Sequence, residues 1–404
     1  MTESPQATMI DRIAGAALAD GSRVDVVIED GRIAAVTPAA SVPAPGAHDL
    51  SGFLLLAAAA EPHAHLDKAL SWDAIRSPMG DLRAAIAAWR VYAERMTVAD
   101  VTERARTQVL RMLRNGTTAI RTHVDVLLGD APLRGVEALV SLREELAALV
   151  DIEIVALAGP DVPTAHLEAA LDAGADAVGG ASHLADDPVA DLHRLLDVAE
   201  RRGVPVDLHT DEGLAAAVTL DAYARRTRGW SQNRSAGHCV RLGTLDEPAR
   251  DEVIAEVVAS GVGIIANPIT NLSLQGWSVP VATPRGIAPA RALLTAGARF
   301  AAGADNVRDP FNPLGRGDAL ETAMLLVVAA HLTAEEAYTA VSTGAREVMG
   351  LPEAGVAVGA RADLLAVRAE SLVQAIAEAP ADRLVMRGGR LVAATTTEGW
   401  VAAP

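Results

Sequence analysis

The sequence predicts an α/β fold: a (β/α)₈ (TIM) barrel over residues 57–352, with a small β-sandwich domain built from both chain ends, 1–56 and 353–404. Three observations predict it. The middle of the chain alternates short β-compatible runs with helix-period segments about eight times. Both ends are rich in short strands with turn signals. Half of the 404 residues are hydrophobic, which is enough to bury a large core.

The two chain ends carry the same hairpin pattern. Residues 23–38, "RVDVVIEDGRIAAVTP", alternate apolar and polar side chains around the pair Asp30-Gly31. Residues 383–394, "RLVMRGGRLVAA", do so around Gly388-Gly389. Asp-Gly and Gly-Gly pairs favour two-residue hairpin turns. We therefore expect both ends to pair into one small β domain.

The middle of the chain differs because its apolar runs are separated by helical segments. Runs such as "IEIVALAG" (152–159) and "PVDLHTDE" (205–212) are short and β-compatible. Segments such as "VADLHRLLDVAERRG" (189–203) have helical periodicity and end in glycine, as helices often do. This alternation over most of the chain predicts parallel strands joined by helices, and its count suits a closed barrel.

Composition excludes several classes of protein. The net charge of −17 argues against a nucleic-acid groove and against binding to an anionic membrane. The single cysteine, Cys239, excludes an intrachain disulfide and predicts a reducing compartment. The N-terminal "MTESPQATMIDR" has no signal-peptide pattern, and no apolar run approaches the ~20 residues that span a bilayer. We expect a soluble cytoplasmic protein.

Two histidines end the first apolar run of the middle region. In "EPHAHLDK" (61–68), His63 and His65 project to the same side of a strand because side chains alternate along it. Two imidazoles at this spacing can share a metal ion, although the pair alone equally fits two structural histidines. Asp67 is expected to cap the turn that follows. Lys68 is expected to face either the pocket mouth or solvent.

Other ionisable side chains also follow predicted strands. His123, His183, His209, His238 and Asp305 all lie at or near strand ends. In a barrel these ends form one face, where chemistry is built. His63, His65, His209 and Asp305 then supply three imidazoles and a carboxylate to one centre, a set that suits Zn²⁺ or Fe²⁺.

Two further residues carry proton chemistry in this prediction. Glu212 follows His209 by three residues and can move a proton between water and a leaving group. Asp211 competes for that role, and Glu212 could instead be an acid at a helix N-terminus. His238 can orient water or a developing oxyanion, or be a core histidine. Cys239 is expected to be a small buried hydrophobe.

Loops after the later strands supply candidate pocket residues. The segment 267–277 holds Asn267, Asn271, Gln275 and Trp277, and it could equally be an ordinary polar loop. Asn306 and Phe311 follow Asp305 and could face a planar substrate. His123 and Asp125 share a strand face and are expected to support the metal site rather than bind the ion.

With these motifs in view, the sequence resembles the amidohydrolase superfamily, and within it the branch of cytosine deaminases and N-isopropylammelide aminohydrolases. The stretches that carry the resemblance are "EPHAHLDK", "IRTHVDV", "DLHTDE", "SAGH", "IANPITNLSLQG" and "GADNVRDPFNPLGRGD". The resemblance covers nearly the whole chain. It implies a barrel with a β-sandwich from both chain ends, and an assembly of identical subunits.

The resemblance also implies roles for the site residues. His63, His65, His209 and Asp305 match the ligands of one divalent metal ion, since no lysine stands where binuclear relatives carry a bridging carbamate. Glu212 matches the proton shuttle and His238 the histidine that helps to activate water. In the implied reaction, metal-bound hydroxide attacks a ring carbon that bears an amino group. Glu212 protonates the adjacent ring nitrogen, and ammonia leaves.

The substrate-binding positions depart from the cytosine deaminase pattern. Gly159 stands where those enzymes carry a glutamine, Asn306 where they carry a second aspartate, and Phe311 where they carry a tryptophan. Together with Gln275, these residues are the predicted substrate contacts. Losing a hydrogen bond to the ring costs about 1–3 kcal/mol if its partner stays buried. The departures therefore predict a larger or differently substituted heterocycle than cytosine.

Three hypotheses follow from the sequence. The first is hydrolytic deamination of an amino-substituted nitrogen heterocycle, either cytosine-like, an aminotriazine or a related ring. The second keeps the metal site but opens a cyclic amide or imidazolone ring, or releases an N-alkylamine. The third is a metal-free barrel that binds small ligands.

Overall fold

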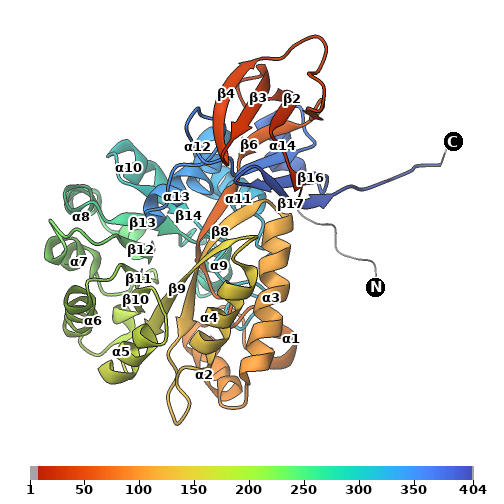
Figure 1. The fold of residues 1–404 in the computed structure, drawn as a ribbon. Coiled ribbons are helices and arrows are strands. Elements are labelled where there is room, and N and C mark those ends of the chain that lie inside the picture. Colours follow the sequence, from red (N-terminus) through yellow and green to blue (C-terminus); the bar gives the residue numbers. More distant parts are fainter. Residues whose placement is uncertain (1–7, 403–404) are drawn as a thin grey trace.

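The computed structural model describes residues 8–402. Residues 1–7 and 403–404, which belong to the predicted β domain, lie outside the described residues. The prediction that there is no signal peptide rests on residues 1–12, and the first seven of these also lie outside the described residues. Figure 1 shows a barrel surrounded by helices and, beside it, a lobe of strands drawn in red and blue, the colours of the two chain ends.

Eight parallel strands form the barrel. In spatial order they run β14-β13-β12-β11-β10-β9-β8-β7. They are β7 (Ala59–Ala64), β8 (Thr117–Asp125), β9 (Asp151–Ala158), β10 (Ala177–Gly180), β11 (Val206–Thr210), β12 (Arg234–His238), β13 (Gly263–Ala266) and β14 (Phe300–Ala302). The barrel closes where Asp305, just past β14, donates its backbone N–H to the carbonyl of His63 at 2.9 Å. The predicted fold class is confirmed.

Helices lie around the barrel, and the last of them lies beside the strands of the chain ends. They are α1 (Trp72–Ile75), α2 (Leu82–Ala93), α3 (Val98–Arg114), α4 (Arg134–Leu146), α5 (Thr164–Asp172), η1 (Ser182–Leu184), α6 (Pro188–Arg202), α7 (Leu220–Arg226), η2 (Arg241–Thr244), α8 (Glu247–Ser260), α9 (Pro268–Leu274), α10 (Ala290–Thr295), α11 (Ala319–Ala330), α12 (Ala334–Ala340), α13 (Thr343–Met349) and α14 (Leu372–Glu378). Helix α6 shows why such segments are helical. The Asp187 side chain caps its first turn, Pro188 follows, and Gly203 ends the helix in the left-handed conformation.

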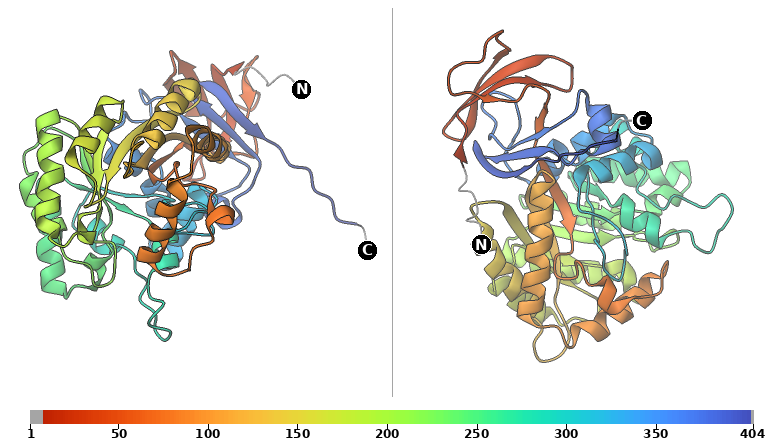
Figure 2. Two further views of the ribbon diagram at one scale, coloured as in Figure 1. Left: turned by 90° about the horizontal axis from the view of Figure 1, so that it is seen from below. Right: turned by 90° about the vertical axis from the view of Figure 1, so that its right-hand side faces the viewer.

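Strands from both chain ends form a second, mostly antiparallel sheet. Its order is β1-β17-β16-β15-β6-β2-β3-β4, with β5 paired to β2. These strands are β1 (Thr8–Met9), β2 (Arg12–Ala17), β3 (Arg23–Glu29), β4 (Arg32–Pro38), β5 (His48–Asp49), β6 (Leu54–Ala57), β15 (Leu364–Val367), β16 (Arg383–Arg387) and β17 (Arg390–Thr395). Figure 2 shows red and blue strands side by side from two further directions. The exact limits 57–352 for the barrel domain stay a prediction.

Both predicted hairpins form. Glu29 pairs with Arg32 across Asp30 and Gly31, whose φ values are 49° and 73°. Gly388 and Gly389, at φ 55° and 76°, join β16 to β17 in the same way. Two consecutive positive φ values define the turn that matches strand twist, and Gly or Asp adopts them at low cost.

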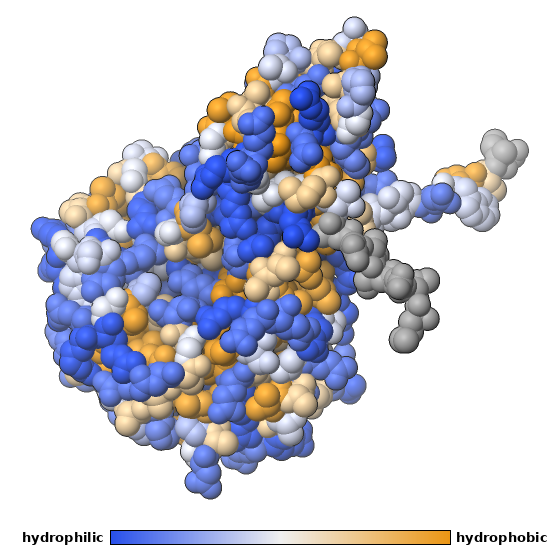
Figure 3. Space-filling view, viewed as in Figure 1, coloured by the Kyte–Doolittle hydropathy of each residue, from blue (hydrophilic) through white to orange (hydrophobic). Residues whose placement is uncertain are grey.

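None of the helices in residues 8–402 is long and apolar enough to cross a membrane. On the face drawn in Figure 3, hydrophilic side chains are interleaved with hydrophobic ones.

A buried ion pair joins the terminal sheet to the barrel. Arg383 on β16 binds both carboxylate oxygens of Asp318 at 2.8 and 2.9 Å, and Asp318 caps α11. Arg383 also donates to the carbonyl of Asn115 at 2.7 Å, at the end of α3. One side chain therefore ties β16 to two helices.

We predict that Arg383→Met lowers the free energy of unfolding by about 3–5 kcal/mol, because it leaves the Asp318 carboxylate buried and unpaired. Urea unfolding followed by circular dichroism measures this. Arg106→Met is the matched control, since Arg106 forms a bidentate but exposed pair with Glu145 and its loss should cost at most about 1 kcal/mol. Equal losses in the two variants would contradict the prediction.

Candidate active site

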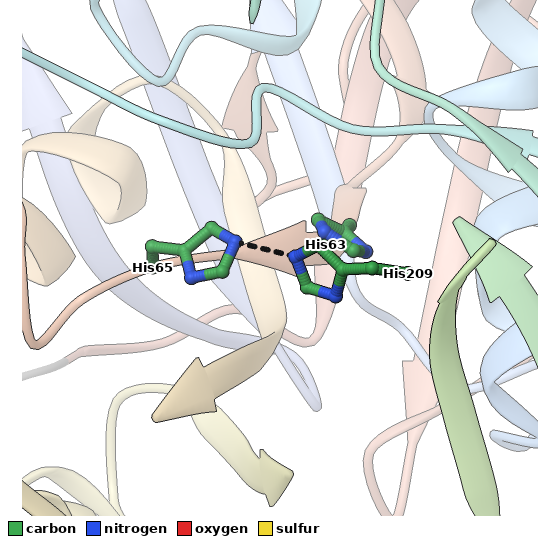
Figure 4. Close-up of side chains that lie close together, drawn as sticks. All are labelled: His63, His65 and His209. Atoms are coloured by element: carbon green, nitrogen blue, oxygen red, sulfur yellow. Dashed lines mark hydrogen bonds between the residues drawn. The ribbon is translucent and has the colours of Figure 1, made fainter. Parts of the chain in front are cut away.

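Four predicted ligand side chains meet at the carboxyl ends of the barrel strands. His63 is on β7, His65 follows it, His209 is on β11 and Asp305 lies beyond β14. The Nε2 atoms of His65 and His209 are 3.1 Å apart, as Figure 4 shows. Asp305 Oδ1 lies 3.3 Å from His65 Nε2 and 3.8 Å from His63 Nε2. The structure therefore brings all four together.

The donor atoms of this cluster fit a divalent cation. Both ring nitrogens of His63 and both carboxylate oxygens of Asp305 are buried without a hydrogen-bond partner among the described residues. Buried polar atoms are normally paired, so this concentration of unpaired acceptors calls for a ligand. Burial lowers the pKa of His63, His65 and His209 well below the ordinary value. Their imidazoles are therefore neutral, which is the form that binds metal.

Backbone geometry aims these side chains. Glu61 accepts from the backbone N–H of His63 at 3.0 Å and from that of Ala304 at 2.9 Å. One carboxylate thus fixes the first and last strand ends relative to each other. Asp305 and His238 have φ values of 57° and 70°, a left-handed conformation that costs most residues about 1–2 kcal/mol. Such strain persists where the surrounding structure fixes it, commonly at functional sites.

A second buried group lies next to the ligands. His123 Nε2 is 3.4 Å from Asp207 Oδ2, and its ring centroid is 4.1 Å from that of His63. Arg121 donates to Asp207 at 3.2 Å and to Ser235 at 2.9 Å. The Arg121–Asp207–His123 chain packs against the ring of His63, so His123 is placed to support that ligand. Asp125, expected beside it, contacts Lys68 instead.

Glu212 and Asp211, which compete in sequence, occupy different environments. The Asp211 carboxylate accepts from Thr219 N and Oγ1 at 2.9 and 2.7 Å and from Leu220 N at 3.2 Å, so it braces the start of α7. Glu212 Oε1 instead lies 3.5 Å from His238 Nδ1. Glu212 precedes α7 by a whole loop and is not an acid of its first turn. Burial, with Asp305 nearby, raises the pKa of Glu212 well above its usual range.

Two asparagines of the next strand end and of α9 hold His238. The amide nitrogens of Asn271 and Asn267 lie 3.0 and 3.4 Å from its two ring nitrogens. Burial lowers the pKa of His238 to about 4, so the ring is neutral at pH 7. Its Nδ1 is 3.9 Å from Asp305 Oδ2, which places it at the edge of the ligand cluster. Cys239 beside it is fully buried.

A cavity of about 660 Å³ opens above the cluster. His65, His209, Glu212 and His238 line its floor, and the predicted contacts Gly159, Asn306 and Phe311 line its walls. Its outer part lies between α2 and the loop after β8, where Ile86 and Leu128 face it. Asn306 is fixed by a 2.7 Å hydrogen bond from its amide to Asp309.

Gln275 is the predicted contact that the structure does not bring into this cavity. It lines a separate outer depression with Trp277, which is 58% exposed. The backbone after α9 turns at Gly276 and carries both side chains away from the ligand cluster. Gln275 is only four residues from Asn271, and this short separation did not indicate that the two side chains would lie in different places.

Lys68 and Trp89, which line the cavity, and Asp67 beside them were missed or left open by sequence reasoning. Lys68 is buried at 2% exposure and lies between Asp67 and Asp125, and Trp89 donates its indole N–H to Asp125 at 2.7 Å. Asp67 therefore pairs with Lys68 in addition to holding the Asp125 backbone N–H at 3.1 Å. One feature of the sequence could have indicated a special role for Lys68, because it is the only lysine in the chain. Trp89, in the middle of a helix, gave none.

Comparisons with known proteins identify the family of the chain. A sequence profile described as "Amidohydrolase family" matches residues 99–399. The chain is 31% identical over 387 residues to a pterin deaminase of Rhizobium rhizogenes, covering 92% of this chain and 88% of the relative.

Two solved structures are similar along nearly the whole chain. The 5-methylcytosine deaminase of Klebsiella pneumoniae, with bound 5-fluorocytosine, gives a TM-score of 0.87 at 27% identity, over 97% of this chain and 99% of that one. The N-isopropylammelide isopropylaminohydrolase of Burkholderia multivorans gives 0.81 at 32% identity, over 95% and 98%. The chain therefore belongs to the amidohydrolase family and is a hydrolase that acts on C–N bonds of cyclic compounds.

Proposed function

We propose that the protein is a hydrolytic deaminase of an amino-substituted nitrogen heterocycle, with one divalent cation, Zn²⁺ or Fe²⁺, held by His63, His65, His209 and Asp305. The observation that carries the proposal is the position of Glu212 and His238. Both line the floor of the cavity beside the ligand cluster. The similarity to deaminases named for pterin and for 5-methylcytosine supports it.

The residues of the chain divide the chemistry between them. When bound, a divalent cation lowers the pKa of a coordinated water and supplies a nucleophile near neutral pH. Glu212, with its raised pKa, can hold a proton on a carboxyl oxygen and deliver it to the ring nitrogen beside the reacting carbon. Neutral His238 can donate to the oxygen that adds to that carbon. A C–O bond forms as the ring nitrogen takes the first proton. Glu212 then takes the second proton from the added oxygen and passes it to the amino group, which leaves as ammonia when the C–N bond breaks.

A second candidate is release of an N-alkylamine from the same kind of ring. The 32% identity to the Burkholderia N-isopropylammelide enzyme favours it. Product analysis separates the candidates, because one gives ammonia and the other an alkylamine. Ring opening would add water to the substrate and release neither ammonia nor an alkylamine.

We predict that the purified protein holds one divalent metal ion per chain and that His65→Ala loses it, because His65 supplies one of four ligands. Elemental analysis after dialysis measures the metal content. His193→Ala is the control, since His193 is exposed on α6. Removing the metal with a chelator should also lower the melting temperature of the wild type, because a bound ion stabilises the native state. Retention of the metal by His65→Ala would contradict the ligand assignment.

We predict that Glu212→Gln lowers kcat by about 10²–10⁴-fold with the metal content unchanged, because the amide cannot carry the proton. Ammonia release from cytosine, isocytosine, aminotriazines and pterin measures the rate. Glu247→Gln, at the exposed start of α8, should behave as the wild type. A Glu212→Gln protein with unchanged turnover would exclude Glu212 as the proton carrier. A protein that releases no ammonia, with or without this substitution, would favour a cavity that only binds ligands.

The size of the cavity favours substrates larger than a single ring. About 660 Å³ lies within the range of ~300–1,000 Å³ that takes drug-sized ligands. We predict that Ile86→Phe, which fills the outer cavity, lowers kcat/KM for pterin by about tenfold or more and leaves that for isocytosine within about threefold. Val91→Phe on the exposed face of the same helix is the control, since Val91 is 66% exposed. Equal effects on both substrates would show that Ile86 does not select for size.

A further inference from the structure

Lys68 is the only lysine among 35 basic side chains, and all the others are arginine. The surface, the helix ends and the buried ion pairs of this protein therefore all use guanidinium groups. The one ammonium lies at 2% exposure in the wall of the catalytic cavity. An ammonium is smaller than a guanidinium and directs three N–H bonds tetrahedrally instead of in a planar fork. This site therefore uses the smaller size and the tetrahedral N–H directions of an ammonium, which arginine lacks.

The contacts of Lys68 fix its ammonium in place. Nζ donates to Asp125 Oδ1 at 2.7 Å and to Asp67 Oδ2 at 3.0 Å. It also lies 5.0 Å from the centre of the Trp89 ring, whose indole N–H holds the other oxygen of Asp125. Two of the three N–H bonds are thus satisfied. The second oxygen of Asp67, Oδ1, lies 3.3 Å from Nζ and can share one N–H with Oδ2. The two carboxylates then occupy two N–H bonds, and the third remains for a ligand in the cavity.

The charge around Lys68 restricts what that ligand can be. Burial lowers the pKa of Lys68, but attraction to Asp125 and Asp67 outweighs burial, so that its pKa lies above the ordinary value and the group stays protonated at neutral pH. The two neighbouring carboxylates already outnumber its single positive charge. A carboxylate or phosphate group on the ligand would meet their repulsion, whereas a neutral carbonyl oxygen accepts a charged hydrogen bond without it.

We propose that Lys68 is a specificity-determining residue that donates its third N–H to a ring carbonyl oxygen of the substrate. The proposal rests on the deaminase function above and narrows its substrate class. The substrate is an oxo-amino heterocycle, in which the carbon bearing the amino group lies over the ligand cluster and a lactam oxygen reaches Lys68. Gly159, also in the cavity wall, has no side chain that could read this oxygen.

The single lysine permits a direct test on the wild-type, metal-loaded protein. Growth with [13Cε]lysine gives one lysine signal in a carbon-13 NMR spectrum. Uracil and pteridine-2,4-dione are the probes, because both carry ring carbonyls and neither has an amino group to lose. We expect at least one of them to bind and to shift the Lys68 signal. An unchanged signal at a probe concentration that inhibits turnover would overturn the proposal, and so would failure of both probes to bind.

Variants of Lys68 add a measurement that separates substrate recognition from a purely structural role of this residue, namely the dependence of kcat/KM on the substrate carbonyl. Lys68→Met should lower kcat/KM for isocytosine or pterin by about tenfold or more, mainly through KM. For 2-aminopyrimidine or 2-aminopteridine, which lack the carbonyl, kcat/KM should stay within about threefold of the wild-type value. Asp67→Asn is the matched control, because it weakens the same buried ion cluster and keeps the ammonium. Lys68 would only stabilise the fold if kcat/KM fell equally for substrates with and without the carbonyl, and equally in the two variants.

The two levels of the proposal fail separately. A protein that deaminates these compounds while its Lys68 signal ignores the probes keeps the deaminase function and loses the role of Lys68. A protein that binds the probes through Lys68 but releases no ammonia from any amino-heterocycle loses the deaminase function and keeps the binding site.

Discussion

The closure of the barrel between β7 and β14 is the interaction on which the site depends. The backbone of Asp305 bonds to that of His63, and the Glu61 carboxylate holds the N–H groups of both strand ends. The first and last strands are separated by more than two hundred residues of sequence, so this contact turns a row of strands into a ring. The same few bonds set the distance between His63 and Asp305. Fold and ligand geometry therefore have a common origin.

The interior around this closure is unusually polar, and its charges are organised in two ways. Arg121 pairs with Glu153 on β9 and with Asp207 on β11, and Lys68 pairs with the adjacent Asp67 and with Asp125 on β8, as buried charges must be paired. The ligand histidines instead are neutral and leave nitrogen atoms without partners. Paired charges fix the position of the site, and the unpaired acceptors are the atoms that we propose to bind a cation. Lys68 belongs to the paired charges, since its Nζ donates to the carboxylates of Asp67 and Asp125.

Sequence reasoning succeeded where the answer depended on local chemistry. Turn residues with positive φ identified both hairpins, and the position of His63 and Asp305 after apolar runs identified the strand ends that meet. It could not separate Glu212 from Asp211, because adjacent residues in a loop differ only in which way the backbone turns. Nor could it place Gln275, whose direction depends on the turn at Gly276.

The sequence by itself determined the alternation of strands and helices, the pairing of the chain ends and the set of four candidate ligands, because side-chain periodicity and turn chemistry are properties of short segments. Only the tertiary structure decided which polar side chains face one another across the cavity. Lys68 and Asp125 are 2.7 Å apart in space but 57 residues apart in sequence. Such pairs form only when separate strands and loops converge on one face of a closed barrel.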